Sequence, residues 1–183
     1  LRSIARINKI TSGKIIQNID HKLGNKKASR AWFKEVGVVY QNPDYQLFME
    51  TVRKEIEFSS KDKEWNDYII DVFNLKKLLR RHPFSLSQGQ KRRLTIALTL
   101  AAKPKLLLLD EPTVGQDYQG LLEIIDILNK VHVETKNTML TISHDVRCAE
   151  ALADRAAVMI NGKIIELGGK EVIQQYFDLN CEK

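Results

Sequence analysis

The sequence has few cysteines and no long apolar run. Two cysteines, Cys148 and Cys181, occur in 183 residues, and their spacing matches neither a metal site nor a redox motif. This scarcity argues against a disulfide scaffold and favours reduced thiols in a cytosolic protein. No segment approaches the roughly 18–20 consecutive apolar residues that span a bilayer, and no signal peptide opens the chain. We therefore expect any role at a membrane to depend on a partner.

Basic residues outnumber acidic ones and give a formal net charge of +6. A basic segment with two aromatic neighbours stands near the N-terminus, and it comprises Lys22, Lys26, Lys27, Arg30 and Lys34 beside Trp32 and Phe33. Such a segment suits nucleic acid, or anionic lipid headgroups that attract basic segments by about 1 kcal/mol per charge. No nucleic-acid-binding motif is present, so we expect no nucleic acid partner.

The strongest local pattern in the chain is a capped helix. Ser87 and Gln90 have the spacing of a capping box, in which each residue satisfies a backbone N–H of the other. Apolar residues then recur with helical period from Leu94 to Ala101. The helix must end at Lys103-Pro104, because proline cannot continue it and restricts the residue before it.

A strand and two carboxylates follow this helix. The run from Leu106 to Leu109 is apolar enough for a central strand that is covered on both faces. Asp110 and Glu111 come directly after it, at the carboxyl edge where open α/β sheets place their ligands. Adjacent carboxylates are costly there unless they meet a metal, a water or a cation. One could help to hold Mg²⁺ while the other polarises a water, as phosphoryl transfer requires.

Five segments together resemble the ATP-binding cassette (ABC) ATPases, in the order that this family shows. They are QNPDYQLFMETVRKEI (41–56), LSQGQ (86–90), LLLLDE (106–111), VGQD (114–117) and TISHD (141–145). They are similar, respectively, to the Q-loop region, the signature motif, the Walker B strand, the D-loop and the switch-histidine loop. The first is similar to the energy-coupling-factor and cobalt-importer branch in particular.

The resemblance implies an α/β, P-loop NTPase-like (RecA-like) fold with a mostly parallel sheet. It implies one ABC ATPase domain over residues 1–183, of which about residues 45–100 form a helical subdomain that carries the signature motif. It also implies ATP and Mg²⁺ as cofactors. The expected function is the ATP-hydrolysing subunit, or half of a fused pair, of an energy-coupling-factor-type importer of a vitamin or metal ion.

Site residues follow from the same resemblance. Glu111 would polarise the attacking water, and His144 would stabilise the γ-phosphate. Asp110 would hold Mg²⁺ largely through its hydration shell, and Gln41 would sense both the metal and the water. The residues that would bind ATP held by the opposite subunit, or cross the dimer interface, are Ser87, Gly89, Gln90 and Asp117. For Ser87 a capping role coexists with this one, since a helix N-terminus also favours phosphate.

We expect two partners. One is a second ABC ATPase subunit, identical or not, and the other is a transmembrane transporter subunit. Tyr45, Leu47 and Phe48 are more apolar than a loop needs. Either they anchor the helix that starts near Thr51, or they form part of a groove for a coupling helix of the transmembrane subunit. Such a protein would lie at the cytoplasmic face of the cell membrane.

The phosphate-binding pattern G-x-x-x-x-G-K-[ST] does not occur in these 183 residues. In the family this Walker A loop directly precedes a helix, and Leu1–Ile7 resembles the tail of an amphipathic helix. We expect a truncated copy. The alternative is a catalytically degenerate half that lends its signature motif to an intact partner.

A DNA-repair or chromosome-maintenance ATPase is a further alternative, because such proteins share the signature and Walker B elements. It would need a long heptad insertion between the Q-loop and the signature motif. Only about 45 residues separate Gln41 from Ser87. We therefore rank this class last.

Overall fold

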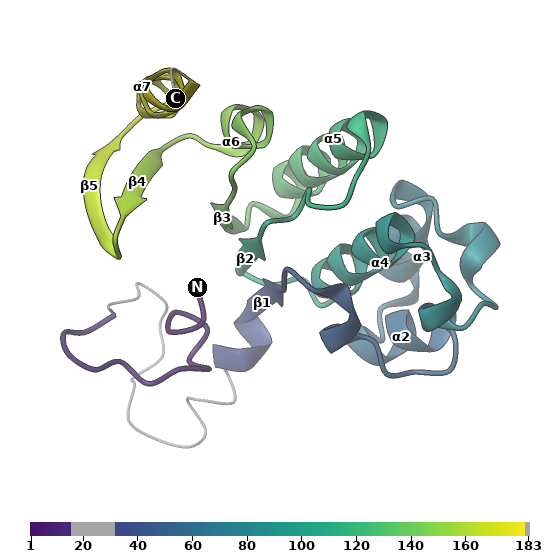
Figure 1. Cartoon of the computed structure of the whole chain (residues 1–183). Helices are drawn as coiled ribbons and strands as arrows, with labels where there is room; N and C mark the ends of the chain where they lie inside the picture. Colours follow the sequence, from purple (N-terminus) through teal and green to yellow (C-terminus); the bar gives the residue numbers. More distant parts are fainter. Residues whose placement is uncertain (16–31, 182–183) are drawn as a thin grey trace.

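A three-stranded parallel sheet lies at the centre of the protein (Figure 1). The computed structural model describes residues 1–15 and 32–181, and side chains as far as residue 177. The strands run in the order β1 (Val36–Val39), β2 (Leu106–Asp110) and β3 (Thr138–Ile142). Val39 pairs with Leu109, and Asp110 pairs with Ile142, so the three strands end at nearly the same level.

The middle strand is the most deeply buried, as its leucine run predicts. Leu107, Leu108 and Leu109 are fully buried. Helices α4 (Gln88–Ala101) and α5 (Tyr118–Thr135) pack near the sheet and supply residues such as Leu94 and Leu128 to the same core. The prediction of a central strand covered on both faces is confirmed.

Further helices gather with α4 beyond β1 (Figure 1). They are η1 (Pro43–Gln46), α2 (Val52–Ser59), α3 (Lys63–Val72), η2 (Lys76–Leu78) and η3 (Pro83–Ser85). The side chains of Thr51 and Asp62 cap α2 and α3 by accepting bonds from backbone N–H groups in the first turns. The longest of these helices spans three turns or fewer, so this part of the chain holds no long coiled-coil arm.

The C-terminal part contains α6 (Val146–Leu152), β4 (Ala156–Ile160), β5 (Lys163–Gly168) and α7 (Glu171–Cys181). Strands β4 and β5 form a separate antiparallel pair. Asn161 and Gly162 adopt φ values of 49° and 75° at the turn between them. Both residue types tolerate this region, which is why Asn-Gly predicts a tight hairpin.

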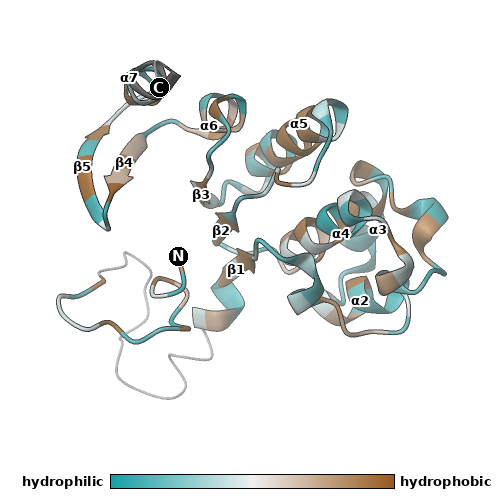
Figure 2. Cartoon of the chain, viewed as in Figure 1, coloured by the Kyte–Doolittle hydropathy of each residue, from teal (hydrophilic) through white to brown (hydrophobic). Residues whose placement is uncertain are grey.

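Strand β3 is more exposed than its sequence predicts. The apolar run from Met139 to Ile142 predicts a buried strand, yet Leu140 and Ile142 are exposed. Among the described residues only β2 pairs with β3, so one edge of β3 has no neighbouring strand. The hairpin β4–β5 also carries exposed apolar residues such as Ile164 and Ile165. Part of β5 is brown in Figure 2.

The N-terminal residues form turns where the sequence suggested the tail of a helix. Ile7 donates to the carbonyl of Arg2, but Arg6 has a φ of 59°, which breaks the helical path. Of the basic segment, Lys22, Lys26, Lys27 and Arg30 lie outside the described residues. No helix in the described part of the chain has the length and apolar character needed to cross a membrane.

Candidate active site

The predicted site residues lie at strand ends or just after them, at one edge of the sheet, and they are Gln41, Asp110, Glu111 and His144. Gln41 comes two residues after β1, Asp110 ends β2, and His144 comes two residues after β3. Because the strands are parallel and end at nearly the same level, all four positions lie along the same carboxyl edge.

Glu111 occupies an unusual backbone conformation. Its φ is 51°, a left-handed value that is uncommon for residues other than glycine. Its N–H donates to the carbonyl of Ile142 at 3.0 Å, and its carbonyl accepts from Val114 at 3.3 Å. These bonds hold a tight turn that directs the side chain back toward β3. Residues in sparsely populated backbone regions cluster at functional sites.

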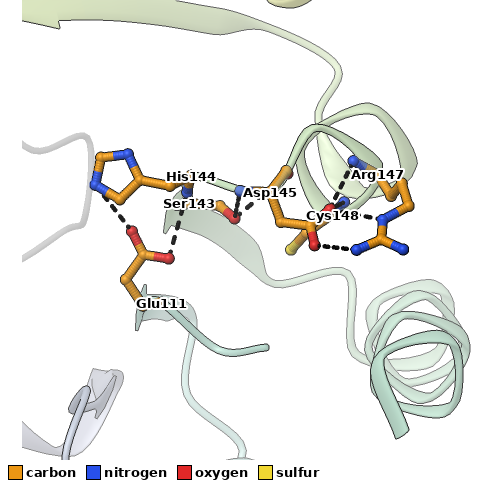
Figure 3. Close-up of polar contacts among 6 residues, drawn as sticks. All are labelled: Glu111, Ser143, His144, Asp145, Arg147 and Cys148. Carbon is orange, nitrogen blue, oxygen red and sulfur yellow. Dashed lines mark hydrogen bonds and ion pairs between the residues drawn. The ribbon is translucent and has the colours of Figure 1, made fainter. Parts of the chain in front are cut away.

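The carboxylate of Glu111 faces His144 (Figure 3). Its Oε1 lies 3.4 Å from Nε2 of the imidazole, and its Oε2 accepts from the backbone N–H of His144 at 3.3 Å. The side chain of Glu111 is 8% exposed, whereas that of His144 is 86% exposed. Among the described residues no donor makes a hydrogen bond to Oε1. Glu111 therefore has one carboxylate oxygen with no hydrogen-bond donor among the described residues, and a carboxylate is one of the groups that can act as a general base.

Arg92 is a buried cation at this edge that the sequence reasoning missed. Burial lowers the pKa of its guanidinium, and the negative charges of Asp110 and Glu111 oppose that effect. Arg92 therefore offsets part of the repulsion between the two carboxylates. The sequence does contain a pattern that predicts a buried cation. Residues 91–93 are three consecutive cations on a helix with apolar residues on every face, so they cannot all point into solvent.

Asp110 and the Gln41 side chain fit a magnesium ion that is held mainly by other groups. The described residues contain no cluster of three or more His, Cys, Asp or Glu side chains that could hold a metal. Mg²⁺ keeps several waters and is usually bound by one or two carboxylates together with substrate phosphates. A single half-buried carboxylate and an exposed amide at the same edge of the sheet are compatible with that pattern.

The N-terminus of α4 has the predicted capping box. Ser87 Oγ accepts from the Gln90 N–H at 3.3 Å, and Gln90 Oε1 accepts from the Ser87 N–H at 3.1 Å. A Cβ atom on Gly89 would lie 3.2 Å from Oε1 of Gln116, so this glycine is closely approached. Within the described residues, no hydrogen bond or ion pair joins the segment 87–90 to Glu111 or His144.

Asp117 caps α5, because its Oδ1 accepts from the Gly120 N–H at 2.8 Å. Its carboxylate therefore has a structural role within the chain. The predicted position of Asp117 at a dimer interface stays a prediction.

The three apolar residues after Gln41 divide into two kinds. Tyr45 and Phe48 are exposed, and Phe48 packs edge-on against Phe58 with ring centroids 5.2 Å apart. Leu47 is only 4% exposed and belongs to the core. Our inclusion of Leu47 in a partner surface is therefore wrong, because its side chain packs inside the protein and anchors the loop.

Residues 1–114 match the family model described as ABC transporter. The chain belongs to the ABC transporter ATPase family. The α/β fold predicted from the sequence is confirmed by solved structures. One is the cbiO1 protein from Clostridium perfringens, described as part of the ABC transporter complex cbiONQ. It aligns with a TM-score of 0.82 and 27% identity, and the alignment covers 97% of this chain and 74% of the cbiO1 chain. A dimeric ATP-binding cassette in a post-hydrolysis state, bound to ADP and Pi, has the same fold, with a TM-score of 0.77, 22% identity, and coverage of 92% of this chain and 78% of its own.

Curated relatives include energy-coupling factor transporter ATP-binding proteins EcfA2. The chain is 39% identical over 171 residues to that of Caldanaerobacter subterraneus, covering 87% of this chain and 59% of the relative. It is 41% identical over 142 residues to that of Clostridium tetani, covering 72% of this chain and 49% of the relative. The chain therefore spans about half to three-fifths of the length of these relatives.

Proposed function

We propose that this chain is part of the ATP-binding and ATP-hydrolysing subunit, or half of a fused pair, of an energy-coupling-factor-type importer. Because the chain spans 59% of its EcfA2 relative, we assign the activity to a longer protein that contains it, called here the full-length protein. The cargo would be a vitamin or a metal ion. The similarity to EcfA2 proteins and to cbiO1 supports this class of transporter.

The observation that carries the proposal is the position of Glu111. Its carboxylate is buried, lies beside His144, and has one oxygen with no hydrogen-bond donor. Glu111 would accept a proton from the attacking water, while His144 would orient that carboxylate and contact the γ-phosphate. Asp110 and Gln41 would hold Mg²⁺, which when bound neutralises charge on the phosphates. Catalysis of this kind depends mostly on positioning and charge stabilisation.

The substitution Glu111→Gln in the full-length protein tests this assignment. The amide keeps the size of the side chain but cannot accept the proton, so we expect ATP to bind while hydrolysis falls by at least about 100-fold. Phosphate release at saturating ATP measures the effect. Near-normal hydrolysis in the variant would show that Glu111 is not the base.

We further propose two partner surfaces. Ser87, Gly89, Gln90 and Asp117 would face a second ATPase subunit, where the N-terminus of α4 offers N–H groups to a phosphate. Tyr45 and Phe48 would contact a transmembrane subunit, which would place the protein at the cytoplasmic face of the cell membrane. The helices between residues 45 and 100 would act as the helical subdomain of one ABC ATPase domain.

A catalytically degenerate half is the second candidate function. These 183 residues contain no G-x-x-x-x-G-K-[ST] pattern, and such a half would not need one. Such a half would supply α4 to an intact partner and would not hydrolyse ATP at its own carboxylates. The coding sequence upstream of Leu1 separates the two candidates, because a glycine-lysine-serine/threonine loop there favours the enzyme.

A further inference from the structure

Two cations of α4 are buried against the loop that carries Gln41. Arg92 is 2% exposed and Lys91 is 7% exposed, although a basic pair on a helix is normally solvated. A buried cation is costly unless it is paired and hydrogen-bonded. The groups that these two side chains bind therefore explain why both are buried in the protein.

Arg92 holds the backbone where β1 ends. Its Nη1 donates to the carbonyl of Tyr40 at 2.6 Å, and its Nη2 donates to the carbonyl of Gln41. The planar guanidinium spans two consecutive carbonyls, which a single ammonium group cannot match in geometry. The arginine thus fixes the backbone of Gln41 but leaves its exposed side chain free to act.

Lys91 holds the same loop three residues after Gln41, at Asp44. Its Nζ donates to Oδ1 of Asp44 at 2.8 Å and lies 5.1 Å from the ring centroid of Phe84. Asp44 is in η1, whose Gln46 side chain bonds back to Tyr40 and Val38. The loop is therefore a folded unit, attached to α4 at both of its ends.

We propose that Lys91 and Arg92 are positioning residues that fasten the Gln41–Asp44 loop to α4, so that the backbone of Gln41 keeps a fixed position relative to α4. The attachment would keep the Gln41 side chain at the carboxyl edge that Asp110 and Glu111 share. The effect of this positioning on hydrolysis rests on the proposed function, but the attachment itself does not.

Amide hydrogen exchange of the full-length protein without nucleotide tests the attachment. We expect Arg92→Met and Lys91→Met to speed exchange in residues 40–49 by about tenfold, the effect of losing one charged hydrogen bond, with α5 unchanged. Asp44→Asn removes the same ion pair from the loop side and should reproduce Lys91→Met without altering α4. Lys91→Arg, which can still reach Asp44, should restore slow exchange. Arg53→Met, which removes an exposed arginine from α2, is the matched control.

Hydrolysis assays give a second, separate readout. We expect Arg92→Met to lower kcat about tenfold with little change in KM for ATP, and Arg92→Lys to recover part of that loss. Unchanged exchange in residues 40–49 in both Arg92→Met and Asp44→Asn would overturn the attachment, and so would equally fast exchange throughout the protein. If the unsubstituted protein hydrolyses no ATP, the proposed function fails while the exchange result still decides the attachment.

Discussion

His144 is the residue whose side chain is best placed to act with Glu111. It is highly exposed, and Nε2 lies 3.4 Å from the carboxylate. Removing the ring by His144→Ala should lower kcat of the full-length protein by about 100-fold, because a preorganised charge-stabilising donor is lost. The backbone N–H that binds Oε2 remains, so the fold should be unchanged. Steady-state phosphate release measures this, and an unchanged kcat would remove His144 from the mechanism.

Cys148 is buried in α6, so the reactivity of its thiol tests how that helix packs. Burial raises the pKa of its thiol, and hydrogen bonds with Ser143 and Thr113 only partly oppose that shift. A buried thiol with a raised pKa is inert. In a Cys181→Ser background we expect at least about 100-fold slower modification of the native protein than of the urea-unfolded protein. Fast modification under native conditions would show that α6 is not packed as described.

At the scale of elements, the capping box should contribute measurably to α4. Ser87→Ala removes the acceptor of the Gln90 N–H, and we expect the free energy of unfolding to fall by about 1 kcal/mol. Gln88→Ala, in the same helical turn, keeps the capping box and should change the free energy of unfolding by less than about 0.5 kcal/mol. Urea denaturation of both variants measures the difference. Equal effects would mean that the box contributes nothing specific.

The N-terminus of α6 should make stability depend on pH. The side chain of Arg147 is the main cause that lowers the pKa of Asp145, and the N–H groups of Arg147 and Cys148 add to it. Because the folded pKa is below the unfolded one, this stabilisation is present above about pH 4 and is lost as pH falls through the folded value.

Asp145→Asn isolates this charge, because asparagine can still cap the helix. We expect the variant to be less stable at pH 7 by about 1 kcal/mol or less. The difference should disappear at acid pH, below the folded pKa of Asp145. Denaturant midpoints at both pH values measure it. A difference that is the same at both would contradict the assignment.

At the scale of the whole molecule, the 183 residues alone should bind ATP poorly. The described site offers carboxylates that repel phosphate, and the sequence has no glycine-rich lysine loop to cradle it. We expect a Kd weaker than about 1 mM by calorimetry with Mg-ATP. Micromolar binding by the isolated chain would show that residues 1–183 hold a phosphate site that we have not found.

Local patterns predicted the elements, whereas the burial of individual residues depended on packing. The leucines of β2, the Ser87–Gln90 box and the Asn161-Gly162 turn could be predicted because neighbours in sequence determine them. The burial of Lys91, Arg92 and Leu47 could not be predicted in this way. Lys91 and Arg92 are buried by a loop about 50 residues away in the sequence, and Leu47 is buried by the core. The exposure of Leu140 and Ile142 likewise depends on what packs against one face of β3, since the exposed residues alternate along the strand.

The central claim is that Glu111 completes a nucleotide site that a second copy of α4 closes. The most direct measurement is the mass of full-length Glu111→Gln protein by sedimentation, together with its partner ATPase subunit where the two differ, with and without Mg-ATP. The account predicts a monomer without nucleotide and a stable dimer with ATP, because the variant binds ATP but cannot hydrolyse it. A protein that stays monomeric with ATP bound, or that continues to hydrolyse it, would contradict the claim.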